Sequence, residues 1–153
     1  MRRYRQFAYL LILTCLLTSC GEANTDKSLV EAGCSKEQSI QVKAHISSQI
    51  DAISGGNWQR AYSLASDSFR SAVTLEEFKQ VIGKQYLFLI FNDGFGFGKC
   101  QLTEQGINQI VNIDFQGKNH ILSYEVSIID DQLGVVSANE ITLTPAQQTW
   151  NTR

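Results

Sequence analysis

The sequence predicts an α+β domain with three N-terminal helices, followed by an antiparallel sheet of about four strands. Between residues 35 and 83, apolar residues recur at helical spacing, and two capping boxes mark helix starts. After residue 97, β-rich segments alternate with short polar turns, which is typical of strands connected by hairpins. Helices first and a meander afterwards place the helices on one side of the sheet.

The first helix is predicted to begin at Ser35, which forms a capping box with Gln38. Its inward face is apolar up to a Gly-Gly pair at residues 55–56, and consists of Val42, Ile46, Ile50 and Ile53. His45 lies near the polar side of this helix. We therefore expect His45 to be a surface residue.

Two further helices are predicted before the sheet. Asn57 caps a short one with Trp58, Ala61, Tyr62 and Ala65, which ends in a polar turn at 66–68. Thr74 and Glu77 form the capping box of the third, whose inward residues are Leu75, Phe78, Val81 and Ile82. The apolar run Tyr86–Phe91 is either a buried strand or the end of the third helix, because periodicity does not separate the two.

The four β-rich segments cover residues 97–103, 107–115, 121–129 and 133–141. Side chains alternate between the two faces of a strand. One face of the second segment therefore carries Ile107, Val111, Ile113 and Phe115, and one face of the third carries Leu122, Tyr124, Val126 and Ile128. We expect the helices to cover this face.

The first twenty residues have the features of a bacterial lipoprotein signal peptide. Three arginines precede an uncharged, mostly apolar run at 7–17, which is too short to span a bilayer. Leu17-Thr18-Ser19-Cys20 then matches the lipobox, in which the cysteine thiol carries the diacylglyceride. An ordinary signal peptide with a chance cysteine and an uncleaved anchor are the alternatives.

This N-terminus predicts four parts of the chain: a signal peptide at 1–19, a lipidated flexible tether at 20–34, the α+β domain at 35–141 and a polar tail at 142–153. We expect lipid attachment to the cell membrane or the outer membrane, with the domain facing the periplasm or the exterior. Loss of the signal peptide leaves ten Lys plus Arg against fifteen Asp plus Glu, a net charge of −5. This mildly acidic chain without a basic cluster argues against nucleic-acid binding.

Cys34 and Cys100 are the two cysteines left in an oxidising compartment, and we expect them to form a disulfide. Two buried free thiols and half of a metal site are the alternatives. No Cys or His lies at metal-ligand spacing to either cysteine, and no cofactor is expected. The glycine-rich stretch 92–99 lacks a Ser or Thr after its lysine, which favours a turn or bulge over a phosphate-binding loop.

The helical half carries the motifs Asn57-Trp58, Ala61-Tyr62, Ala65-Ser66 and Phe69-Arg70, followed by Leu75, Phe78 and Tyr86. This set resembles the nuclear transport factor 2-like (cystatin-like cone) superfamily, and most of all its small bacterial envelope members of unknown function. The resemblance covers about residues 38–141. It implies a curved sheet wrapped around the helices, with a conical pocket between them. The candidate pocket residues are Tyr62, Tyr86, His120 and Tyr124.

That superfamily includes enzymes, ligand binders and dimerisation modules, so the fold does not give the function. We favour a non-enzymatic lipoprotein that binds an envelope protein or a small apolar ligand. The alternative is a pocket enzyme of the isomerase or dehydratase type, which needs a carboxylate base and an oxyanion donor. Asp114 is a candidate base, but strand alternation points it away from the core. A structural module or a homodimer is the third hypothesis.

Overall fold

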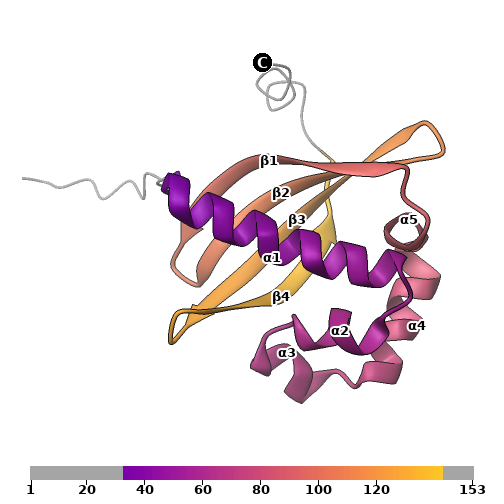
Figure 1. The fold of residues 1–153 in the computed structure, drawn as a ribbon, viewed down its shortest axis with the longest axis horizontal. Coiled ribbons are helices and arrows are strands. Elements are labelled where there is room, and N and C mark those ends of the chain that lie inside the picture. The colour runs from indigo at the N-terminus through magenta and orange to yellow at the C-terminus, as the bar shows by residue number, and fades with distance from the viewer. Residues whose placement is uncertain (1–32, 143–153) are drawn as a thin grey trace, which may run out of the picture.

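The computed structural model describes residues 33–142. The predicted signal peptide, the predicted lipid site at Cys20, nearly all of the tether and most of the C-terminal tail therefore lie outside the described residues. Within residues 33–142, helices come first and a four-stranded antiparallel sheet follows (Figure 1). This arrangement confirms the predicted α+β class. No helix in this part of the chain is long and apolar enough to cross a membrane.

The helical part contains five helices in the described residues, rather than the three that the sequence predicted. They are α1 (Lys36–Ser54), α2 (Trp58–Ser63), α3 (Asp67–Ala72), α4 (Leu75–Gln85) and α5 (Leu87–Ile90). The expected polar turn at 66–68 is wrong, because Ser66 is the N-cap of α3 and accepts a hydrogen bond from the Phe69 N–H at 3.1 Å. The ambiguous run Tyr86–Phe91 contains the single-turn helix α5.

Both predicted capping boxes are present. The Ser35 hydroxyl accepts from the Gln38 N–H at 3.1 Å, and the Gln38 side chain accepts from the Ser35 N–H at 2.9 Å. At the start of α4, the Thr74 hydroxyl accepts from the Glu77 N–H, and the Glu77 carboxylate accepts from the Thr74 N–H at 2.8 Å. These reciprocal bonds satisfy helix N–H groups that have no partner inside the helix.

The strands are β1 (Gly94–Thr103), β2 (Gly106–Phe115), β3 (Lys118–Ile129) and β4 (Gln132–Glu140), in the order β1-β2-β3-β4. Each pairs antiparallel with its neighbour in sequence. The β2–β3 and β3–β4 turns have two consecutive residues with positive φ, Gln116-Gly117 and Asp130-Asp131, as tight hairpins require. A bulge interrupts β1 between Phe97 and Cys100.

The helices lie on one face of the sheet and bury it (Figure 1). The fully buried apolar and aromatic residues of the two central strands are Ile107, Val111, Ile113, Leu122, Tyr124 and Val126, and α1 adds Val42, Ile46, Ile50 and Ile53. Two residues predicted to point inward are exposed instead. Ile128 is 42% exposed, at the end of β3 that runs past α1 (Figure 1). Val81 is 41% exposed on α4.

A disulfide joins Cys34 to Cys100, with 5.5 Å between their Cα atoms, as the sequence predicted. It connects the start of α1 to β1. Beside it, the Cys34 N–H donates to the Cys100 carbonyl at 3.3 Å, and Gly33 bridges to Gln101. The chain that enters the domain is therefore held against the C-terminal half of β1.

Candidate functional site

A cavity of about 90 Å³ lies between the helices and the inner face of the sheet. We call it the helix–sheet cavity. Most of its wall is apolar, including Phe69, Phe78, Ile82, Leu89 and Val135, and its polar members are Gln49, Tyr124 and Ser137. A water molecule takes up about 30 Å³ in the liquid, and pockets for drug-sized ligands have about 300–1,000 Å³. The cavity therefore suits a few waters or a very small ligand.

Phe78 of α4 is the centre of the aromatic wall of this cavity. Its ring contacts Trp58 and Tyr62 of α2 at centroid distances of 6.5 and 6.0 Å, and Phe69 of α3 at 6.1 Å. The Trp58 and Phe69 rings meet it edge to face, a geometry favoured by the ring quadrupoles. Three helices thus hold this wall in place.

Tyr124 of β3 is the ionisable side chain in the cavity wall. Burial raises the pKa of its hydroxyl, and the neighbouring Tyr86 raises that pKa further, because both effects disfavour the phenolate. Tyr124 makes no hydrogen bond to another residue of 33–142, and its hydroxyl is not among the fully buried polar atoms that lack a partner, so the hydroxyl lies at the cavity surface. Tyr124 is therefore a neutral hydroxyl at neutral pH and can donate a hydrogen bond to a guest.

Gln49 of α1 is the second polar side chain in the wall. It is buried among the apolar residues of α1, and its Nε2 donates to the Ala61 carbonyl of α2 at 3.2 Å. The sequence carried a signal for this residue, because Gln49 follows Ile46 by three positions and so lies on the apolar face. We did not single it out from the sequence.

Of the four candidate pocket residues, only Tyr124 lines the helix–sheet cavity. The Tyr62 hydroxyl instead donates to two backbone carbonyls, at 2.7 Å to Val73 and 3.1 Å to Arg70. It thereby ties α2 to the end of α3. Asp114 is exposed, as alternation predicted, and accepts a hydrogen bond from Asn119 at 3.0 Å.

His120 and Tyr86 lie against Phe88 of α5 rather than in the cavity wall. The imidazole stacks on the Phe88 ring with 4.2 Å between centroids, and the Tyr86 ring meets Phe88 edge to face at 5.7 Å. His120 Nδ1 lies 2.7 Å from Glu140 Oε1 at the end of β4. Neither His120 nor Tyr86 lines the cavity, although Tyr86 lies close enough to Tyr124 to raise the pKa of the Tyr124 hydroxyl.

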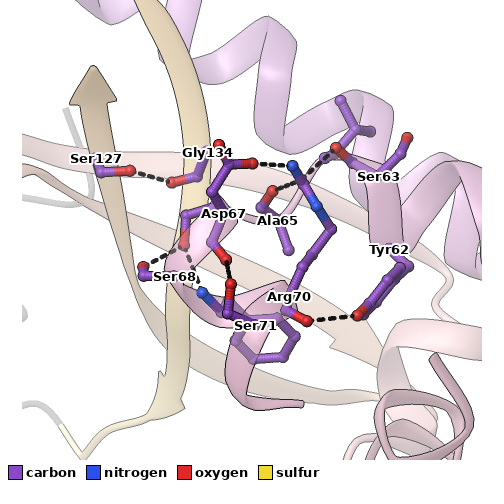
Figure 2. A network of polar contacts seen from close by, with 12 residues as sticks. Tyr62, Ser63, Ala65, Asp67, Ser68, Arg70, Ser71, Ser127 and Gly134 are labelled. Atoms are coloured by element: carbon purple, nitrogen blue, oxygen red, sulfur yellow. Dashed lines mark hydrogen bonds and ion pairs between the residues drawn. The ribbon is translucent and has the colours of Figure 1, made fainter. Parts of the chain in front are cut away.

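A second, polar pocket of about 260 Å³ lies between α3 and the β3–β4 hairpin. Figure 2 shows that its Arg70 side chain is already engaged. The guanidinium donates to the Ser63 carbonyl at 2.9 Å and also to the Ala65 carbonyl, and it pairs with the Asp67 carboxylate. These bonds hold the α2–α3 turn, so the charges of Arg70 and Asp67 already have structural partners.

The α2–α3 connection (residues 64–66) runs along β4. The Ser66 N–H donates to the Val135 carbonyl at 2.8 Å, and the Val135 N–H donates to the Leu64 carbonyl at 3.0 Å. His45 Nε2 lies 2.8 Å from the same Leu64 carbonyl and is the donor there, since a carbonyl only accepts. The prediction that His45 is a surface residue is therefore wrong: it is half-buried and fastens this connection to α1.

Gln109 is a buried amide that we did not identify from the sequence, although it shares the inward parity of Ile107 and Val111. Its Nε2 donates to the carbonyls of Gly98 and Lys99, at 3.0 and 3.3 Å. These residues form the β1 bulge, so Gln109 satisfies carbonyls that the interrupted ladder leaves unpaired. Its Oε1 is buried without a hydrogen-bond partner among the described residues.

Across residues 33–142, no three His, Cys, Asp or Glu side chains are grouped so that they could hold a metal ion.

Neither a curated protein nor a solved structure matches the chain. Residues 35–149, which include nearly all of the described domain, match a family model. The chain therefore belongs to the family described as domain of unknown function DUF4864.

Proposed function

We propose that this protein is a lipid-anchored envelope protein whose α+β domain binds a small, mostly apolar molecule in the helix–sheet cavity without transforming it. The observation that carries the proposal is Tyr124, a buried side chain in a mostly apolar wall whose hydroxyl makes no hydrogen bond to another residue of 33–142 and lies at the cavity surface. A buried tyrosine hydroxyl usually finds a hydrogen-bond partner. A guest with one acceptor atom and an apolar body would supply it.

Binding is better supported than proton transfer. The raised pKa of Tyr124 keeps its hydroxyl protonated at neutral pH, so it serves as a donor rather than as a base. The histidine and carboxylates considered for an isomerase-type reaction lie elsewhere: His120 is paired with Glu140, and Asp114 is on the exposed side of β2. An acid–base reaction in the cavity would therefore lack its second group.

The fold and the N-terminal sequence support two other parts of the proposal, the superfamily and the membrane anchor. Helices packed on one face of an antiparallel sheet, with a cavity between them, support membership of the nuclear transport factor 2-like superfamily. The lipobox at Cys20 supports attachment to the cell membrane or the outer membrane. Metabolic labelling with a palmitate analogue tests the anchor: label should enter the wild type and be lost in Cys20→Ala.

Native mass spectrometry of the full chain, purified from its own membrane in mild detergent, tests the cavity. The wild type should retain a bound small molecule. Tyr124→Phe removes one hydroxyl at constant shape and should weaken retention on the order of tenfold, since one hydrogen bond contributes about 1 kcal/mol. Tyr86→Phe makes the same change outside the cavity wall and should retain the molecule. Ligand-free protein in repeated preparations would count against the proposal.

A second candidate function is binding of an envelope protein, which two exposed apolar residues favour, the first residue of α5 and the residue that caps its C-terminus. Leu87 is 45% exposed and Phe91 is 63% exposed. The Phe91 N–H donates to the Leu87 carbonyl at 3.1 Å, so the two lie one helical turn apart on the same face. Affinity purification should then recover an envelope protein with the wild type, and less of it with Phe91→Ser.

A further inference from the structure

Two polar side chains, Gln49 of α1 and Tyr124 of β3, share the mostly apolar wall of the helix–sheet cavity. Both are more than nine-tenths buried, with exposed fractions of 4% and 1%. Their neighbours in the wall include Ile53, Phe78 and Leu89, whose side chains offer no hydrogen bond. A ligand in the cavity must therefore form its hydrogen bonds mainly with these two side chains.

The amide of Gln49 presents an acceptor to the cavity. Its Nε2 donates to the Ala61 carbonyl at 3.2 Å, and since a carbonyl only accepts, this bond fixes which end of the amide is the oxygen. The Oε1 atom makes no hydrogen bond to another residue of 33–142, and it is not among the fully buried polar atoms that lack a partner. Oε1 therefore lies at the cavity surface.

The hydroxyl of Tyr124 presents a donor to the same cavity, because it stays protonated and lies at the cavity surface. The third polar residue of the wall is Ser137, whose hydroxyl donates to the Glu125 carboxylate at 3.4 Å. The proton of Ser137 thus already has an acceptor. The wall pairs an amide oxygen on α1 with a phenol donor on β3.

The wall carries no charged side chain among the residues that the structure describes. A buried ion without an opposite charge is costly. A carboxylate would also bring its oxygens against the Gln49 Oε1, since neither group has a proton to donate. The part of a ligand that enters this cavity is therefore neutral.

The cavity meets solvent between α4 and β4. Val81 of α4 lines it and is 41% exposed, and the wall residues 136–138 of β4 are half-buried. Val81 thus lies on the apolar face of α4 without being buried, because it stands at this opening. A longer ligand can place one end in the cavity of about 90 Å³ and extend through the opening.

We propose that the cavity selects the neutral hydroxyl or primary amide end of an apolar molecule, whose polar group accepts from Tyr124 and donates to Gln49. This inference rests on the ligand binding proposed above and adds the class of polar group. Displacing water from the cavity loses affinity unless the ligand replaces the hydrogen bonds of that water. A hydroxyl or a primary amide replaces both, whereas an ether or an ester replaces only the one from Tyr124.

A pair of isomers tests the hydrogen bond that the ligand donates. Butan-1-ol and methyl propyl ether have nearly the same volume, but only the alcohol can donate. NMR titration of the full, disulfide-intact chain in mild detergent is followed on the methyl groups of Ile82 and Val135 in the cavity wall. The alcohol should have a Kd about five- to tenfold lower, since one hydrogen bond contributes about 1 kcal/mol.

A second pair of probes tests the requirement for a neutral group and separates the amide from the alcohol. Butyramide and butyrate have the same carbon chain and differ in charge. Butyramide should compete with butan-1-ol for the same methyl shifts, and butyrate should bind on the order of tenfold more weakly than butyramide. Comparison of the Kd values of butyramide and butan-1-ol shows which of the two polar groups the cavity prefers.

Replacement of Gln49 assigns the preference to its oxygen. Gln49→Met removes Oε1 at similar length and should abolish the preference for the alcohol, because both isomers keep the hydrogen bond from Tyr124. Gln85→Met makes the same change on an exposed residue of α4 and should leave the preference unchanged. The comparison of isomers in the wild type stands even if Gln49→Met does not fold.

Equal affinity of the wild type for the two isomers would overturn the inference and leave ligand binding in the cavity intact. Butyrate binding as tightly as butyramide would do the same, as would a preference for the alcohol that survives in folded Gln49→Met. If no probe shifts the Ile82 and Val135 methyl signals, the inference and the proposed function both fail.

Discussion

Replacing Gly134 by alanine tests how the α2–α3 connection is held against β4. An ideal Cβ at residue 134 would lie 2.6 Å from the Ser66 Cα and 3.0 Å from the Ser66 backbone nitrogen. Both atoms belong to the backbone, so no flexible side chain can move aside. The added methyl group must therefore push residues 64–66 away from the strand.

The displacement lowers the unfolding free energy in two ways, by overpacking and by weakening a hydrogen bond. Overpacking by a methyl group costs about 1–3 kcal/mol. Separation from the strand also weakens the 2.8 Å hydrogen bond from the Ser66 N–H to Val135, worth about 0.5–1.5 kcal/mol. We expect Gly134→Ala to lose about 2–4 kcal/mol of unfolding free energy, a large share of the roughly 5–15 kcal/mol of an ordinary domain.

Urea unfolding followed by far-UV circular dichroism, with the disulfide intact, measures this loss. Gly83→Ala is the matched control, because a Cβ at Gly83 in α4 would meet no atom within 4 Å. Alanine in a helix is favoured over glycine by about 0.5–1 kcal/mol, so this variant should be at least as stable as the wild type. If the unfolding free energy of Gly134→Ala lies within about 0.5 kcal/mol of the wild-type value, the added methyl group does not force residues 64–66 away from β4.

Three further predictions concern groups that stabilise the domain. Gln109→Leu leaves the carbonyls of the β1 bulge without their donor and should cost about 1–3 kcal/mol in urea unfolding; a stability equal to the wild type would contradict this role. Reduction of the Cys34–Cys100 disulfide, which closes a loop of 66 residues, should lower the unfolding free energy by about 4 kcal/mol on the chain-entropy model, and the Cys34→Ser/Cys100→Ser variant should not respond to reductant. Hydrogen bonds from the Thr74 backbone and hydroxyl lower the pKa of Glu77 below 4.5, so its stabilising contribution is present above that pH and is lost as the pH falls through the folded-state value. Carboxyl NMR titration should show this lowered pKa, and Thr74→Ala should move it back towards 4.5; an unchanged titration would assign the shift to another cause.

Features that depend on neighbours in sequence were predictable. The capping boxes that open α1 and α4 use residues three positions apart, and the inward face of β3 follows from the period of two. The disulfide was predictable for another reason, since Cys34 and Cys100 remained as a pair once the signal peptide and lipid site were assigned. The fold class followed from the order of these elements.

Other features were decided only by contacts between distant residues. Within the Tyr86–Phe91 run, residues 87–90 form a single helical turn that buries Phe88 and Leu89, which periodicity alone could not show. The sequence offered four pocket candidates of similar chemistry, yet only Tyr124 lines the cavity.

By itself, the sequence determined where α1, α2 and α4 begin, which face of the central strands is buried and which cysteines pair. Only the tertiary structure decided that Gly134 must leave room for Ser66, that His45 fastens the α2–α3 connection, and that Gln49 and Tyr124 line one cavity. The physical reason is the separation along the chain of the residues that interact. Capping and alternation act within a few residues, whereas close approach and the wall of a cavity exist only once distant segments have packed together.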